Sequence, residues 1–350
     1  MNITPITLEV FKNKFASVAE EMGVALTRTA YSPNIKERRD FSCAVFDSGG
    51  DMLAQAAHIP VHLGSMPLSV RAVIDAIDLG PGDMAMLNDP FRGGTHLPDI
   101  TLVAPVHAGG DSPLFYVACR AHHADVGGMA AGSMPLSTSI FQEGLVIPPV
   151  KIVADGEIVQ GVMDLFLANV RTPQERQGDF AAQIMANRTG IARLTALAAH
   201  HGRERLAAMG AALLDYAERL MQAAIEAIPD GTYEAADSLD NDGAGTNDPT
   251  LRLTLTVEGG RAELDFSRSD PQTPGCINAV RSIVVSAALY VFRARAGRAV
   301  PANAGCLRPI DVTTKAGTMA DARFPAAVAG GNVETSQRLV DVILLALAQA

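Results

Sequence analysis

The chain has 350 residues, of which 48% are hydrophobic, so its length and composition predict a globular protein of two or three domains. Its formal net charge of −10 argues against nucleic acid or an anionic membrane as the main partner, because both favour a basic surface. No run reaches about 18 consecutive apolar residues, the length that a membrane helix needs, and the N-terminus lacks the apolar core of a signal peptide. We therefore expect a cytoplasmic protein.

Hydrophobic periodicity and turn residues predict helices and hairpins along the first part of the chain. Apolar side chains spaced by three or four residues favour helices, and strand-like runs that flank Gly- and Asp-rich turns favour hairpins. In chain order these patterns predict a helix over 4–30, a hairpin over 41–57, a loop with His58 and His62, a helix over 66–77, a strand over 83–87, and a second hairpin with strands at 100–106 and 114–121.

The rest of the chain begins with a long loop. Residues 127–149 lack periodicity, and a loop of this length in a compact domain is typical of a functional lid. The later patterns predict two or three helices over 164–228, a hairpin over 251–267, an apolar helix or buried segment over 276–294, and an amphipathic helix over 332–350.

Together these elements predict an α+β fold of mixed hairpins and helices with a central helical segment. We expect three parts: a His- and Asp-rich mixed α/β site domain (1–150), the helical segment (151–230) and a second α+β domain (231–350). The last helical pattern stops at Ala350 without a cap, so the second domain is expected to be incomplete at its C-terminus.

Six of the eight histidines lie between positions 58 and 123, and three of these belong to two motifs joined by the second hairpin. The motifs are HLPD (96–99) and HHAD (122–125). Pro98 disfavours a helix, so His96 and Asp99 can converge only through a loop turn. Two imidazoles and one carboxylate form the minimum open site for a divalent first-row metal. The alternative is a hydrogen-bonded cluster that fixes the loops.

The sequence does not decide which of two adjacent histidines is the third ligand. Side chains alternate along a strand, and His122 shares its face with Arg120 on the more polar side of the second hairpin. This alternation loosens at a strand end, so either His122 or His123 could point to the metal. Asp125 would then be a further ligand or a group that orients an imidazole.

Residues near the motifs have both functional and structural interpretations. His58 and His62 could contact substrate, supplement the ligands or serve structure alone. Gly93 and Gly94 allow either close backbone approach to a ligand or a tight turn.

Two arginines and four cysteines complete the candidates. Arg92 and Arg120 could grip a carboxylate or phosphate, or form salt bridges. No glycine-rich run matches a phosphate-binding loop, so this chain is not expected to bind a nucleotide itself. The cysteines are far apart and are expected to be buried free thiols: Cys43, Cys119, Cys276 and Cys306.

At these motifs the chain resembles the hydantoinase B/oxoprolinase family, the B-type subunits of ATP-dependent N-methylhydantoinases and 5-oxoprolinases. The alpha-type subunits of acetone and acetophenone carboxylases belong to the same superfamily. The matching stretches follow the family's order over nearly the whole chain: RRDFSCAVFD, HIPVHLGSMP, GDMAMLNDPFRGGTHLPDI, HHADVGG, NAGCLRPI and AGGNVETSQR.

The resemblance implies a hetero-oligomer that uses a metal. In this family a hydantoinase A-like partner uses ATP to phosphorylate the substrate carbonyl, and the B-type chain completes the reaction. In the carboxylase branch the corresponding residues hold manganese. By this resemblance His96, Asp99 and either His122 or His123 would bind a divalent metal, manganese, zinc or iron.

The remaining roles belong to the hypothesis that the chain is part of a hydrolase. Asp125 would orient a ligand or accept a proton, and Arg92 and Arg120 would bind an anionic intermediate. The residues expected in catalysis are Asp125, His123 and Arg120. The residues expected to bind substrate are Arg92, Gly93, Gly94, His58 and His62.

The sequence therefore leaves three alternative functions. The first is the B-type component of an ATP-dependent hydrolase that opens hydantoin- or oxoproline-like rings. The second is a component of a ketone carboxylase with the same site. The third is a truncated, non-catalytic scaffold for an A-type partner, because members of this family are typically longer than 350 residues.

Overall fold

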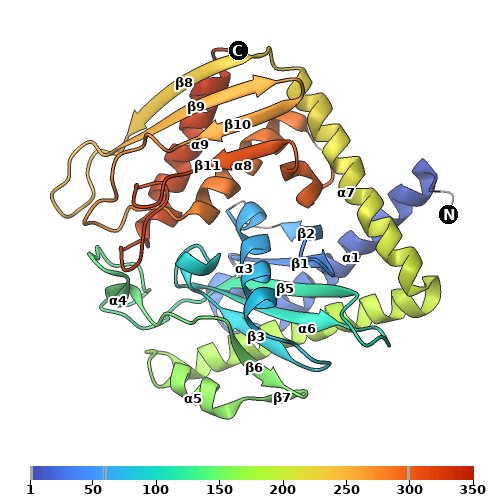
Figure 1. Cartoon of the computed structure of the whole chain (residues 1–350). Helices are drawn as coiled ribbons and strands as arrows, with labels where there is room; N and C mark the ends of the chain where they lie inside the picture. The colour runs from blue at the N-terminus through green and yellow to red at the C-terminus, as the bar shows by residue number, and fades with distance from the viewer. Residues whose placement is uncertain (1–2, 58, 60, 298–299) are drawn as a thin grey trace.

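The computed structural model describes residues 3–57, 59, 61–297 and 300–350, which form helices and two sheets (Figure 1). The prediction of an α+β fold is confirmed. Figure 1 shows the second sheet at the top, the first sheet below it, and α7 running along one side between them. The helices are α1 (Pro5–Thr29), α2 (Pro33–Lys36), α3 (His62–Ala76), α4 (Ile140–Glu143), α5 (Gln160–Leu167), α6 (Pro173–His201), α7 (Arg203–Glu226), α8 (Arg281–Ala296) and α9 (Glu334–Leu347).

Within the described residues, the first sheet has seven strands in the order β2-β1-β5-β4-β3-β6-β7, each antiparallel to its neighbours. They are β1 (Phe41–Asp47), β2 (Met52–Ala57), β3 (Met84–Leu87), β4 (Asp99–Val106), β5 (Phe115–His122), β6 (Val150–Ala154) and β7 (Glu157–Ile158). The strands β1, β4 and β5 read as nearly continuous buried runs because α1 and α6 pack on one face of the sheet and α3 packs on the other.

The second sheet has the order β11-β10-β9-β8, and only its β10–β11 pair is parallel among the strands that the structure describes. Its strands are β8 (Gly231–Ser238), β9 (Thr250–Glu258), β10 (Arg261–Asp265) and β11 (Ile310–Thr313). Burial alternates along β9, as expected for a sheet covered on one face. That cover includes α9, which packs on β8 and β9 and also on α8.

The two sheets are joined through a close contact between α3 and α8. A Cβ atom at Gly64 would lie 2.8 Å from the Cα atom of Ser286, so only glycine lets the helices approach this closely. The C-terminal part of the chain thereby reaches the end of the first sheet at which β4 begins and β5 ends, because Asp99 and His122 line one pocket together with residues of α8 and α9.

The structure corrects several element boundaries. The helix α3 begins at His62 instead of residue 66, since Pro67 is accommodated within its early turns. His62 is therefore helical, whereas the sequence favoured a loop; His58 lies outside the described residues. The long loop predicted over 127–149 contains the short helix α4 and leads into β6.

The proposed division of the chain at residues 150 and 230 stays a prediction. The first sheet includes β6, which begins at Val150, and β7, which lies beyond it, and α6 packs on α1. Within the described part of the chain, no helix combines the length and the apolar character needed to cross a membrane.

Candidate metal centre

The second hairpin places one carboxylate opposite one imidazole at its open end. Asp99 is the first residue of β4, His122 is the last residue of β5, and the two are cross-strand partners. The turn before β4 adds His96, whose carbonyl oxygen accepts a hydrogen bond from the Asp99 N–H at 3.1 Å. The rings of His96 and His122 are 5.0 Å apart between centroids.

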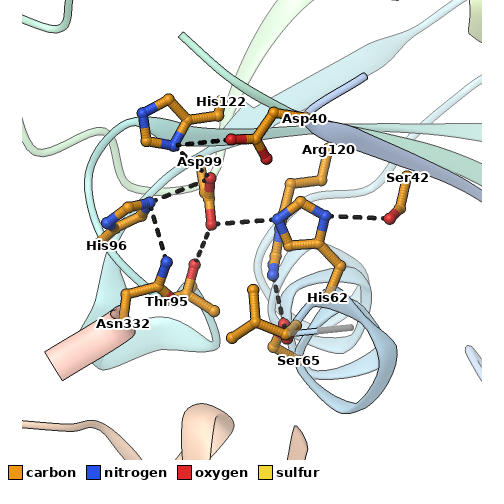
Figure 2. A network of polar contacts seen from close by, with 12 residues as sticks. Asp40, Ser42, His62, Ser65, Thr95, His96, Asp99, Arg120, His122 and Asn332 are labelled. Carbon is orange, nitrogen blue, oxygen red and sulfur yellow. Dashed lines mark hydrogen bonds and ion pairs between the residues drawn. The ribbon is translucent and has the colours of Figure 1, made fainter. Parts of the chain in front are cut away.

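One oxygen atom lies at the centre of this group (Figure 2). Asp99 Oδ1 is 3.2 Å from His96 Nε2 and 3.3 Å from His122 Nδ1. One donor atom from each of these three residues lies within 4.8 Å of the other two. The side chains of His96 and Asp99 are 1% exposed and that of His122 is 16% exposed, so the group is nearly removed from bulk water.

The second carboxylate oxygen of Asp99 is held by the protein. Thr95 Oγ1 donates a hydrogen bond to Asp99 Oδ2 at 2.7 Å, and His62 Nε2 lies 3.3 Å from the same oxygen. His62 Nδ1 in turn lies 3.0 Å from Ser42 Oγ. These contacts turn Oδ1 toward the two histidines, which is how groups behind a metal ligand commonly orient it.

The buried charges shift the pKa values of these groups in opposite directions. Burial raises the pKa of Asp99, but the charges of the His96 and His62 rings outweigh burial and hold it well below its usual range. Burial lowers the pKa of His62. Burial also opposes the charged form of His122, yet the neighbouring Asp99 carboxylate raises its pKa. Asp99 is thus kept as a carboxylate, the form that binds a cation.

Two buried polar atoms without a hydrogen bond indicate which kind of ligand the cluster suits. Asp99 Oδ1 and His96 Nδ1 are buried and make no hydrogen bond in the described structure, although the carboxylate oxygen lies within ion-pair distance of two rings. A buried oxygen without a hydrogen-bond donor is costly unless another group satisfies it. Two imidazole nitrogens and one carboxylate oxygen suit a divalent first-row cation, so the residues present fit such an ion.

The cluster opens into a pocket of about 520 Å³. The polar cluster forms one part of the lining, and α8 and α9 supply another. Met134, from the segment expected to form a lid, also lines the pocket. The residues on the α8 and α9 side are Ile283, Ser286, Ala287, Tyr290, Ser336, Gln337, Val340 and Asp341.

Two further pocket residues were missed by the sequence reasoning. Asp40 Oδ2 lies 3.9 Å from His122 Nδ1, and burial followed by the charge of Asp99 raises the pKa of Asp40. Asn332, in the short 3-10 helix η3 (Gly330–Asn332), directs its amide nitrogen to His96 Nε2 at 3.2 Å. Both residues lie in stretches that carry the family resemblance, and that resemblance was the only feature of the sequence that could have indicated their place in the pocket.

The structure corrects the prediction for His123, because the His123 side chain lies on the face of the sheet that points away from the cluster. It is fully buried against Phe166 and Phe180, and its Nε2 lies 2.9 Å from Gln183 Oε1. Burial lowers the pKa of His123 to about 4, which keeps the ring neutral. Strand alternation, which left either histidine open, therefore holds up to the end of β5 and directs His122 to the cluster.

Arg120 and Asp125 also occupy structural positions. Arg120 is fully buried and donates hydrogen bonds to Thr101 Oγ1, Ser65 Oγ and Ser69 Oγ. Burial lowers its pKa to about 10. Asp125 accepts hydrogen bonds from the backbone and side chain of Arg171 at 2.6 and 2.7 Å. Neither residue lines the pocket over the cluster, so the expected catalytic roles do not fit their positions.

Arg92 and its neighbouring glycines face the protein's own backbone or the solvent. Arg92 is 60% exposed and lies 3.5 Å from Asp89. A Cβ atom at Gly93 would lie 2.5 Å from the Leu68 backbone, and one at Gly94 would lie 2.7 Å from backbone oxygens. These glycines allow tight packing against α3 and the preceding turn, and the expectation that they approach a ligand does not fit. The cysteines are free and buried, as expected.

Comparisons with known proteins agree with the motifs. The family model described as hydantoinase B/oxoprolinase matches residues 4–350. The chain is 39% identical over 354 residues to a 5-oxoprolinase from Dictyostelium discoideum, covering 98% of this chain and 28% of that protein. It is 30% identical to a protein from Pseudomonas sp. (strain NS671) that is named a putative B-type subunit of a D-/L-hydantoinase, covering 99% of this chain and 62% of the other.

Solved structures share the fold. The ATP-dependent caprolactamase from Pseudomonas jessenii superposes with a TM-score of 0.93 at 30% identity, over 100% of this chain and 61% of that one. The nucleotide-free acetone carboxylase superposes with a TM-score of 0.90 at 18% identity, over 99% of this chain and 48% of that one, which shows the fold alone. The chain therefore belongs to the hydantoinase B/oxoprolinase family.

Proposed function

We propose that this chain is the metal-binding, B-type component of a cytoplasmic, ATP-dependent hydrolase that opens cyclic amides. The observation that carries the proposal is Asp99 Oδ1, buried without a hydrogen bond between His96 and His122 at the floor of a pocket. Support also comes from the names of similar proteins, a 5-oxoprolinase, a caprolactamase and a component of a hydantoinase, since each of these names refers to a cyclic amide.

The chain's own residues would prepare the site for a carbonyl. A divalent cation held by His96, Asp99 and His122 would polarise that carbonyl or lower the pKa of a water molecule. Thr95 and His62 keep the Asp99 carboxylate in place. Asp40 lines the same pocket, where a carboxylate can accept a proton from an attacking water. The apolar residues of α8 and α9 would shield the ring from solvent.

ATP is proposed to act in another chain. The sequence contains no phosphate-binding loop, and the similar protein from Pseudomonas sp. (strain NS671) is named as one subunit of a larger enzyme. An A-type partner would therefore activate the ring carbonyl and deliver it to the pocket. This hetero-oligomer is the form in which turnover is expected.

A metal analysis tests the site directly. The protein purified without chelator is expected to carry about one equivalent of manganese, zinc or iron, whereas the double variant His96→Ala, Asp99→Ala should carry none. His123→Ala is the matched control, because it removes a neighbouring imidazole that points to the other face. Equal metal content in the double variant and the control would refute the metal assignment.

Turnover tests the reaction. The chain co-purified with its A-type partner is expected to open hydantoin, 5-oxoproline or a lactam only when ATP is present. Carboxylation of a ketone with bicarbonate, in place of ring opening, would assign the carboxylase function. No turnover of either kind with an intact, ATP-hydrolysing partner would support the scaffold.

A further inference from the structure

Asn332 extends from the C-terminal part of the chain to the cluster of His96, Asp99 and His122. Its Nδ2 lies 3.2 Å from His96 Nε2, although the two residues are 236 positions apart in the sequence. Its Oδ1 is buried and has no hydrogen-bond partner in the described structure. Figure 2 shows the amide directed at the His96 ring, beside Asp99. Both ends of the amide therefore lack a partner that would remain once a cation is bound.

The position of Asn332 is set by its own backbone surroundings. The preceding residue, Gly331, packs so closely that a Cβ atom would lie 1.9 Å from the carbonyl oxygen of Asn278. The segment before it is held by Glu143, whose buried Oε1 accepts a hydrogen bond from the Val328 N–H at 2.8 Å. The amide is thus presented to the pocket by a rigid framework that does not depend on its contact with His96.

A cation and Asn332 compete for the same nitrogen. His96 Nε2 is the ring atom that faces Asp99 Oδ1, so it is the atom that would bind the cation. A nitrogen that gives its lone pair to a cation cannot also accept a hydrogen bond from Nδ2. Metal binding therefore releases an amide donor in a nearly buried pocket, where an unsatisfied donor is unfavourable.

We propose that Asn332 Nδ2 donates a hydrogen bond to the oxygen of the activated ring carbonyl, which carries the phosphoryl group transferred by the A-type partner. One water adds to the carbonyl carbon and the ring C–N bond breaks, with the nitrogen taking a proton; a second water then displaces the phosphoryl-bearing oxygen, which leaves as phosphate with the electron pair of the broken C–O bond. That oxygen gains negative charge as it leaves, so a preplaced donor stabilises the transition state more than the bound ring. The inference rests on the proposed function, because it assigns a catalytic residue to that same pocket.

The alternative role for Asn332 is a fourth metal ligand through Oδ1. The observed orientation opposes it, since the nitrogen, which cannot bind a metal, is the amide atom nearest His96. The two roles predict different behaviour of two variants. Asn332→Asp keeps an oxygen ligand but removes the donor, whereas Asn332→Ala removes both.

The first experiment measures metal affinity by competition titration of the metal-free chain with zinc. If Asn332 is a donor, Asn332→Ala should bind zinc at least as tightly as the unmodified chain, because no amide then competes for His96 Nε2. An affinity at least tenfold lower for Asn332→Ala, together with unchanged affinity for Asn332→Asp, would identify a ligand and overturn the proposal. The exposed Asn13→Asp, which adds the same charge far from the pocket, is the control and should leave the affinity unchanged.

The second experiment measures ATP-dependent ring opening by the complex with the A-type partner. Both Asn332 variants should lower kcat by about 100-fold, with a smaller change in KM, as expected when one oxyanion donor is lost. Unchanged kcat in either variant would overturn the proposal. Thermal unfolding of each variant shows whether the fold is retained.

A third measurement keeps the inference testable if the unmodified complex opens no ring. Acetohydroxamate, a small carbonyl compound that binds metals, is titrated into the cobalt-loaded chain and followed by the visible spectrum. The unmodified chain should bind it about tenfold more tightly than Asn332→Asp or Asn332→Ala. Equal affinities would refute the role of Asn332, whereas absent turnover alone would refute only the proposed function.

Discussion

Thr95 offers a direct test of how the protein positions Asp99, the carboxylate proposed to bind the metal. Its hydroxyl donates a 2.7 Å hydrogen bond to Asp99 Oδ2, and both side chains are almost fully buried. In Thr95→Val the side chain keeps its shape but loses the donor. The carboxylate would then retain only His62, at 3.3 Å, as a partner for that oxygen.

The size of the effect follows from the charge on Asp99. A hydrogen bond to a charged group contributes about 1.5–3 kcal/mol, and Asp99 is ionised because its pKa is held well below its usual range. Loss of a group that orients a metal ligand commonly weakens metal binding by about 10–100-fold. That range corresponds to about 1.4–2.7 kcal/mol, so the two figures agree.

The assay is a zinc titration of the metal-free chain, with Thr101→Val as the control. Thr101 is an equally buried threonine on β4, but its hydroxyl contacts Arg120 and not Asp99. Both variants should unfold at lower temperature, and only Thr95→Val should lose about 10–100-fold in zinc affinity. Equal zinc affinities in the two variants would show that the position of Asp99 does not depend on Thr95.

Three further predictions concern the rest of the fold. His122→Ala should abolish metal binding, whereas His123→Ala should lower stability but keep about one metal per chain, as measured by elemental analysis. Burial disfavours ionisation of Asp242, but three backbone N–H groups lower its pKa to about 2. This depressed pKa contributes about 2 kcal/mol of stability that is present above pH 4 or so and is lost as the pH falls toward 2; Asp242→Asn should remove that dependence from acid unfolding curves. Gly331→Ala should lower the melting temperature by several degrees, because its Cβ atom would lie 1.9 Å from a carbonyl oxygen. Gly161→Ala, in α5 with nothing within 4 Å, should leave the melting temperature unchanged or raised.

Local patterns were sufficient for most of the secondary structure. The long helix near the N-terminus and the two hairpins of the first sheet follow from hydrophobic spacing and turn residues, which act within a few positions of each other. The start of α3 was missed because Pro67 suggests a helix beginning at that point, whereas the structure extends the helix back to His62.

The candidate site was only partly visible in the sequence, for a physical reason. His96, Asp99 and His122 lie on one hairpin and its turn, so strand pairing alone brings them together. Asn332 reaches the same place only through the packing of α8 and α9 on the rest of the molecule, which no local pattern encodes. Charge and residue type also nominated Arg120 and Asp125, but these groups are satisfied by buried partners that the sequence does not reveal.

The separation along the chain between the two parts of the pocket lining implies an order of assembly during synthesis. The proposed ligand set is complete once β4 and β5 pair, and this pairing requires no residue beyond His122. Such local contacts form faster than contacts between distant segments. We therefore expect a nascent chain to capture its ion before the segment with Asn332 has left the ribosome. The binding pocket would close only later, around a metal that is already in place.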